Sequence, residues 1–174
     1  MTLKELNTIE SKTAKAALSK CCGSSKWVDQ MISARPFANE EKLMQAADRI
    51  WNSLAPPDWL EAFSHHPRIG KIEDLEAKFA STQSWATEEQ NGIRGAPRGV
   101  IQDLAKENLD YEKRFGHVFL VCATGKTAEE MLGLLRNRMK HTPEQELKTA
   151  AEQQIKITHI RLEKLLNPKE ATQP

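Results

Sequence analysis

Only one stretch of this chain, His117-Val-Phe-Leu-Val-Cys-Ala123, has the pattern of a β-strand. In most of the remaining sequence, apolar residues recur three or four positions apart, which is the spacing of an amphipathic helix. A lone strand has no neighbour with which to form a sheet, so its N–H and C=O groups need other partners. The sequence therefore predicts an all-α fold, with roughly eight to ten helices in a single compact domain over residues 1–174 and one short extended segment around residues 117–123.

The expected helices are bounded by glycine, proline and N-capping residues. Thr8 and Asn39 are suitable caps, and Thr127-Ala-Glu-Glu130 has the pattern of a capping box. On this basis the sequence predicts helices at residues 8–20, 25–34, 40–54, 58–64, 71–80, 85–93, 98–115, 127–140 and 142–166.

Composition excludes several classes of function. Of the 174 residues, 28% are charged, and the net charge of +1 lacks the basic excess expected of a nucleic-acid-binding or membrane-surface protein. There is no apolar run long enough to cross a membrane, and the N-terminus does not resemble a signal peptide. Three cysteines without a Cys-x-x-Cys spacing favour a reducing, cytoplasmic setting and no metal site.

The segment Ala62-Phe-Ser-His-His-Pro-Arg-Ile-Gly70 is the first candidate for chemistry. Pro67 disfavours helical geometry at His66, so the preceding helix should end near His65 and leave His66 on extended backbone. The ordinary pKa of histidine lies near neutrality, which suits proton transfer. The alternative is structural: His65 caps the helix C-terminus and His66 packs in the core.

Two charged residues lie on apolar helix faces. Glu89 is in line with Trp85 and Ile93, and has no cation three or four residues away. Arg161 likewise has no acidic neighbour at those spacings on its own helix. Such charges need a partner from another segment or from a ligand. The competing interpretation is that Glu89 and Arg161 pair with each other, or that Glu89 forms some other tertiary salt bridge.

The strand-like run has three candidate partners: a small polar ligand, a neighbouring chain or ordered water. The following Gly125-Lys126-Thr127 is not a phosphate-binding loop, because the Walker pattern needs a glycine at position 120, which is Leu. Cys22 and Cys122 are interpreted as buried small hydrophobic residues.

Four motifs together resemble a known family. They are His-Pro-Arg-Ile-Gly at 66–70, Trp-Ala-Thr-Glu-Glu-Gln-Asn-Gly at 85–92, Phe-Gly-His-Val-Phe-Leu-Val-Cys-Ala-Thr-Gly at 115–125 and Ile-Arg-Leu-Glu-Lys-Leu-Leu at 160–166. In this order and spacing they resemble the 2-oxo-4-hydroxy-4-carboxy-5-ureidoimidazoline (OHCU) decarboxylases of purine catabolism. The Arg35-Pro36-Phe37 turn and the run from Tyr111 to Gly116 extend the likeness over nearly the whole chain.

The resemblance implies an all-helical, cofactor-free enzyme, usually a homodimer, that converts the small molecule OHCU into (S)-allantoin and carbon dioxide. It also implies a catalytic role for His66 and Glu89. The implied substrate-binding residues are Pro67, Ala86, Thr87, Glu88, Gln90, Phe119, Leu120, Val121, Cys122, Ala123 and Arg161.

One position departs from the family pattern. The serine of the family's Ser-x-x-Glu-Gln segment is Ala86 here, so one hydroxyl donor to the substrate is missing. Two alternative functions stay open from the sequence. One is a helical binding or adaptor module, and the other is an enzyme of the same fold that acts on a related heterocycle.

Overall fold

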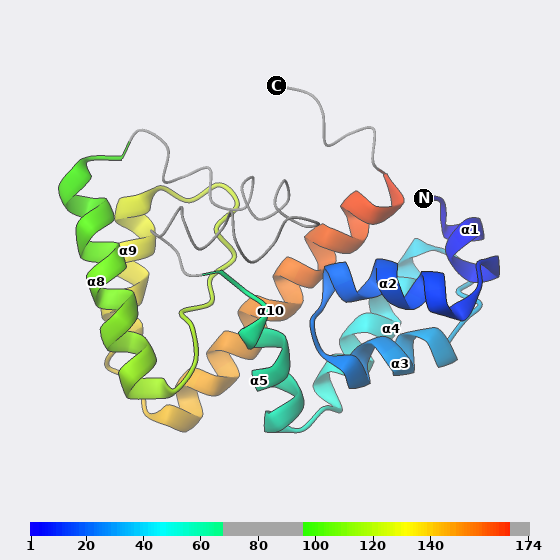
Figure 1. Cartoon of the computed structure of the whole chain (residues 1–174), viewed down its shortest axis with the longest axis horizontal. Coiled ribbons are helices and arrows are strands. Elements are labelled where there is room, and N and C mark those ends of the chain that lie inside the picture. Colours follow the sequence, from blue (N-terminus) through cyan, green and yellow to red (C-terminus); the bar gives the residue numbers. More distant parts are fainter. Residues whose placement is uncertain (68–95, 168–174) are drawn as a thin grey trace. The chain divides into compact units, whose positions relative to one another are not determined.

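The structure is a computed structural model that describes residues 1–67 and 96–167. Within these ranges the chain forms eight α-helices and no β-strand (Figure 1), which confirms the predicted all-α class. The predicted helices at residues 71–80 and 85–93 lie outside the described residues. The helices are α1 (Leu3–Thr8), α2 (Ser11–Cys21), α3 (Ser25–Ser33), α4 (Glu40–Asn52), α5 (Pro56–Ser64), α8 (Arg98–Phe115), α9 (Ala128–Arg138) and α10 (Pro143–Leu166).

The chain divides into two compact units. Unit 1 comprises Met1–Ala62 and Ile155–Pro174, and unit 2 comprises Phe63–Gln154. Each unit is described by itself below, and α10 contributes residues to both. The single domain predicted over residues 1–174 stays a prediction.

In unit 1, helix α3 packs against both α2 and α4. Trp27 and Trp51 are fully buried there, and Trp27 Nε1 donates to the backbone carbonyl of Ala47 at 3.2 Å. The predicted cap of α4 is confirmed, because the Asn39 side chain accepts from the Lys42 N–H at 2.8 Å.

The predicted helix start at Thr8 is wrong. Thr2 begins α1 through a capping box with Glu5, and the Thr8 hydroxyl donates to the Lys4 carbonyl at 2.9 Å inside that helix. The helix ends at Thr8, and α2 begins at Ser11 without a side-chain cap. A sequence of helical composition therefore contains a break that lacks glycine or proline.

Arg35 supplies the donors that this break needs. Its Nη1 donates to the carbonyls of Leu6 and Ile9 at 2.9 and 3.0 Å. The following Arg35–Pro36 peptide bond is cis. Two hydrogen bonds join Asn7 and Phe37. The Phe37 N–H donates to Asn7 Oδ1 at 2.8 Å, and Asn7 Nδ2 donates to the Phe37 carbonyl at 2.9 Å.

In unit 2, α8 and α9 lie side by side (Figure 1). Helix α8 ends at Gly116, whose φ of 77° is in the left-handed region that favours glycine. The chain then runs without helix or strand through residues 117–123. The Thr127–Glu130 capping box that begins α9 is confirmed.

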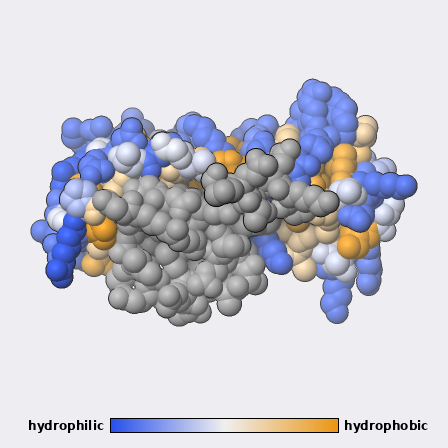
Figure 2. Space-filling view, turned by 90° about the horizontal axis from the view of Figure 1, so that it is seen from above, coloured by the Kyte–Doolittle hydropathy of each residue, from blue (hydrophilic) through white to orange (hydrophobic). Residues whose placement is uncertain are grey.

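In Figure 2 the described atoms on the visible face are mostly hydrophilic, with hydrophobic residues in small separate areas. Among the large hydrophobic residues that the structure describes, those exposed are Leu60 and Leu109. None of the described helices has the length and apolar character that a membrane crossing requires.

Candidate active site

His66 lies at the end of α5, as the sequence predicts. The helix ends at Ser64, and the His66 N–H donates to the Phe63 carbonyl at 3.0 Å. His66 is buried, with 8% of its surface exposed, whereas the adjacent His65 is exposed. Pro67 is half-buried. The two neighbouring imidazoles therefore lie in different environments. The imidazole of His66 is shielded from solvent, and that of His65 is not.

The segment Phe119–Ala123 is held along one edge by side chains. Leu120, Phe119, Val121 and Ala123 are buried, and Cys122 is half-buried. The Leu120 carbonyl accepts from Arg138 Nη1 at 2.6 Å. At Cys122, the N–H donates to Gln153 Oε1 at 3.0 Å and the carbonyl accepts from Lys126 Nζ at 2.8 Å.

Several N–H groups of the segment have no hydrogen-bond acceptor among the described residues. In a trans peptide unit the carbonyl and the N–H point in opposite directions, so the N–H of Val121 points away from Arg138 and that of Ala123 points away from Lys126. No described residue accepts a hydrogen bond from the N–H groups of Phe119, Val121 or Ala123, nor from that of Leu120. Buried N–H groups are nearly always paired, so this edge is suited to a ligand that carries acceptor oxygens.

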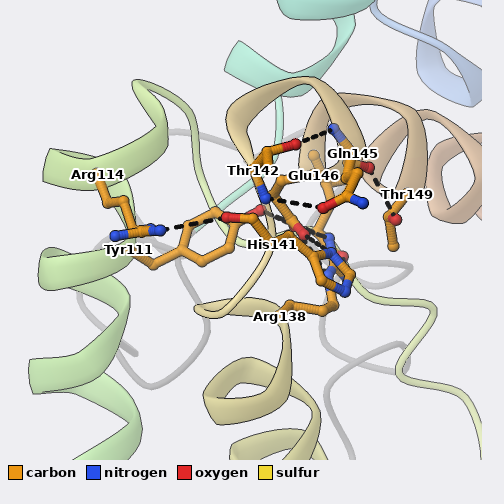
Figure 3. A network of polar contacts seen from close by, with 9 residues as sticks. Tyr111, Arg114, Arg138, His141, Thr142, Gln145, Glu146 and Thr149 are labelled. Carbon is orange, nitrogen blue, oxygen red and sulfur yellow. Dashed lines mark hydrogen bonds and ion pairs between the residues drawn. The ribbon is translucent and has the colours of Figure 1, made fainter.

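A buried ion pair anchors the segment to α9 and α10 (Figure 3). Arg138 Nε donates to Glu146 Oε1 at 2.8 Å, and the Tyr111 hydroxyl donates to the same oxygen. His141 Nδ1 lies 2.8 Å from Glu146 Oε2. Figure 3 shows these side chains converging from the end of α9, the start of α10 and the facing side of α8. Burial raises the pKa of Tyr111, so its hydroxyl stays protonated as a donor.

Aromatic rings connect this network to the end of α5. The ring of Tyr111 lies 5.2 Å from that of Phe119 and 5.6 Å from that of His117. The ring of His117 in turn lies 5.2 Å from that of Phe63, three residues before His66. Burial lowers the pKa of His117, whose Nδ1 donates to the Val118 carbonyl at 3.0 Å. The candidate histidine and the open backbone edge thus belong to one packed unit.

Arg161 belongs to unit 1. It lies on α10 and is 8% exposed. Cys22 is nearby: burial raises the pKa of its thiol to about 12, while hydrogen bonds with the Ser24 backbone and the Thr158 side chain and the charge of Arg161 lower the pKa. Cys22 is therefore an inert, buried thiol, as the sequence predicts. The assigned role of Arg161 stays a prediction.

Ala86, Thr87, Glu88, Glu89 and Gln90 lie outside the described residues. The predicted roles of these five residues, and the alternative pairing of Glu89 with Arg161, stay predictions. Within residues 1–67 and 96–167, no group of three or more His, Cys, Asp or Glu side chains is placed to hold a metal ion.

Comparison with known proteins identifies the family. A sequence model described as OHCU decarboxylase matches residues 7–163 of the chain. The chain belongs to the OHCU decarboxylase family. This confirms the family and the enzyme class, a decarboxylase, that the four motifs predict.

Relatives of this family extend over most of the chain. It is 37% identical over 149 residues to the uric acid degradation bifunctional protein TTL of Arabidopsis thaliana, covering 86% of this chain but only 46% of that protein. The chain thus spans about half the length of that relative. An OHCU decarboxylase of Amia calva is 29% identical, with 77% of this chain and 76% of that protein covered.

The solved structures agree with this assignment. A crystal structure of OHCU decarboxylase in the presence of (S)-allantoin superposes with a TM-score of 0.71 at 35% identity, covering 91% of this chain and 99% of that one. An (S)-allantoin synthase structure gives a TM-score of 0.70 at 20% identity and supports the fold. It covers 96% of this chain and 55% of that one.

The sequence did not single out the side chains that hold the segment. By sequence pattern, Glu146, Gln153 and Arg138 are ordinary helix residues, and Lys126 belongs to a Gly-Lys-Thr run that does not fit a phosphate-binding loop. A signal for Glu146 was present, since Ala150 and Ile157 follow it at helical spacing and both are buried. Glu146 is thus, like Glu89, a carboxylate on an apolar helix face, but its pairing with Arg138 has no signal in the sequence.

Proposed function

We propose that this member of the OHCU decarboxylase family converts OHCU to (S)-allantoin and carbon dioxide in urate breakdown. The proposal is supported by family membership and by relatives named for uric acid degradation and for OHCU decarboxylation. One structural observation supports the chemistry. The segment Phe119–Ala123 has N–H groups without an acceptor among the described residues, and it lies in the same unit as the buried His66.

The reaction explains why such N–H groups are useful. The bond between the ring carbon and the carboxylate breaks, carbon dioxide leaves, and the electron pair delocalises into the adjacent C=N and ureido system. The nitrogen that receives the electron pair is protonated. The hydroxyl on the carbon that lost carbon dioxide then gives up its proton and becomes the ring carbonyl, while the neighbouring carbon, which carries the ureido group, takes a proton on one face. Fixed N–H groups that point at the developing negative charge lower the barrier without reorganising solvent. In this mechanism His66 exchanges a proton with the substrate hydroxyl or with the reacting carbon.

The remaining roles follow from the chemistry of each side chain. Glu89 and Gln90 hydrogen-bond the ureido or ring nitrogens and orient the ring. The guanidinium of Arg161 suits a carboxylate or ring oxygen, and Pro67 lines the pocket. Ala86 offers no hydroxyl, so Thr87 or Ser84 takes over that contact, through a shifted rotamer or a water molecule.

We further propose that the enzyme is a cytoplasmic homodimer that works without a cofactor. The low net charge and cysteine usage agree with that setting. Decarboxylation of this substrate needs no electron acceptor, because its own C=N system receives the electron pair.

Freshly generated OHCU provides the test, because its spontaneous decay gives racemic allantoin. The protein is added to OHCU, and circular dichroism follows the appearance of the (S) enantiomer, with heat-treated protein as the control. We expect an optically active product only with the intact protein. A racemic product formed at the uncatalysed rate would contradict the proposal and favour a binding module.

A further inference from the structure

Two peptide units of the segment Phe119–Ala123 each have a cationic side chain at the carbonyl oxygen. In the unit that joins Leu120 to Val121, the carbonyl accepts from the Arg138 guanidinium at 2.6 Å. In the unit that joins Cys122 to Ala123, the carbonyl accepts from the Lys126 ammonium at 2.8 Å. The N–H groups of the same two units, those of Val121 and Ala123, are donors without an acceptor among the described residues.

A cation bound to a carbonyl oxygen makes the N–H group of the same peptide unit a stronger hydrogen-bond donor. It draws electron density toward the oxygen, and such polarisation along a hydrogen-bonded chain adds roughly 10–30% per bond. Charge-assisted bonds are also about twice as strong as neutral ones, so they fix the orientation of the peptide plane more firmly. Both effects improve a donor aimed at developing negative charge.

The two cations differ in how much of their charge is available. Arg138 is paired with Glu146, and its guanidinium also lies over the Phe119 ring at 4.7 Å. Lys126 makes no ion pair with any carboxylate that the structure describes. Among the described residues, therefore, no carboxylate offsets the charge that Lys126 directs at the Cys122 carbonyl.

Lys126 is also held in place by its own backbone. Its N–H donates to the Ala123 carbonyl at 3.0 Å, which closes a turn through Gly125 at φ 75°. The next residue, Thr127, is the N-cap of α9. The side chain therefore starts from a fixed point, which reduces the entropy lost when its ammonium group binds the Cys122 carbonyl.

We propose that Lys126, with Arg138 on the neighbouring peptide unit, is a positioning residue that orients and polarises the Ala123 and Val121 N–H groups toward charge that develops during decarboxylation. This inference rests on the proposed function. Lys126 acts through the backbone and does not touch the substrate.

The test uses K126M, which keeps the length of the side chain and removes its charge. K126R restores a cation, and K148M is the matched control, because Lys148 makes only an exposed pair with Glu144. For each variant, kcat and KM for OHCU, the affinity for (S)-allantoin and the thermal midpoint are measured.

We expect kcat of K126M to fall about tenfold, less than the roughly 10²–10³-fold that follows loss of an entire oxyanion donor. KM and the affinity for neutral (S)-allantoin should change by less than about threefold, because the lost interaction is stronger in the transition state. K126R should recover most of kcat, and K148M should match the wild type.

A second measurement reports on the peptide unit itself. In K126M the amide proton resonance of Ala123 should move upfield, while that of Val121, whose carbonyl partner is Arg138, stays in place. Unchanged kcat in K126M, a loss confined to KM, or an unmoved Ala123 amide would overturn the inference. A wild-type chain that forms no (S)-allantoin contradicts the proposed function, and the inference with it. An active wild type with fully active K126M contradicts the inference alone.

Discussion

The guanidinium of Arg138 and the carboxylate of Glu146 form an ion pair that is shielded from solvent, with side chains 7% and 0% exposed. Both carboxylate oxygens have further partners, since Tyr111 donates to Oε1 and His141 lies 2.8 Å from Oε2. Removal of either charge would leave the other buried and unpaired, which is more costly than replacement of both by apolar groups.

For Arg138→Met we therefore expect a loss of about 3–5 kcal/mol in the free energy of unfolding. Urea denaturation followed by circular dichroism measures it. The double variant Arg138→Met/Glu146→Leu should recover a substantial part of this loss, because no unpaired charge remains. Equal stability of the single and double variants would show that the cost does not come from the stranded carboxylate.

His66→Ala should lower turnover by roughly 10²–10⁴-fold, the usual range for loss of a general acid–base. The measurement is the rate of (S)-allantoin formation from OHCU, with the thermal midpoint as a check on folding. His65→Ala is the matched control, since His65 is adjacent but exposed. Wild-type turnover in His66→Ala would remove this imidazole from the mechanism.

Glu89→Gln tests the acidic residue that the sequence places on an apolar helix face. We expect turnover to fall by roughly 10²-fold or more while the thermal midpoint changes little, because a catalytic carboxylate contributes to the reaction rather than to folding. Thermal unfolding and steady-state kinetics are compared. If the variant instead unfolds at a much lower temperature, Glu89 is a structural ion-pair partner.

The stability of the protein should depend on pH through His117. Burial lowers the pKa of this group below its ordinary value of 6.5, so the unfolded chain takes up the proton at a higher pH than the folded chain. The contribution of His117 is therefore complete above about pH 6.5 and is lost as the pH falls through the lowered value.

Thermal unfolding of His117→Phe, measured between about pH 5 and 8, tests this dependence. Phenylalanine can keep the ring contacts with Phe63 and Tyr111 but cannot titrate. We expect the stability of the variant to fall less steeply below pH 6.5 than that of the wild type. Parallel pH profiles would exclude His117 as a source of the dependence.

Much of the fold could be predicted because its boundaries have local causes. Asn39 and Thr127 immediately precede residues of helical periodicity, and each accepts a hydrogen bond from the first turn. Pro67 ends the helix before His66 through a steric effect on one residue. The break after Thr8 has no such local signal, because the donors that satisfy its carbonyls come from Arg35.

The candidate site, like the fold, could be predicted only where the cause is local in sequence. The position of the non-helical segment could be predicted, since its run of apolar residues is the one strand-like pattern in the sequence. Its anchors were not, because Arg138 and Glu146 lie on different helices and meet only after the loop between α9 and α10 turns. Periodicity indicates which face of a helix is buried, but not which polar group on a second helix will lie opposite.

The proposed recognition through unpaired N–H groups also has an evolutionary consequence. A donor that belongs to the main chain is present whatever side chain the residue carries, with proline as the exception. The side chains at Phe119, Val121 and Ala123 are therefore free to drift among residues of suitable size without removing a ligand contact. Selection for binding at this edge would act on the bonds that hold the backbone in place. It would therefore act on residues that are distant from the segment in sequence.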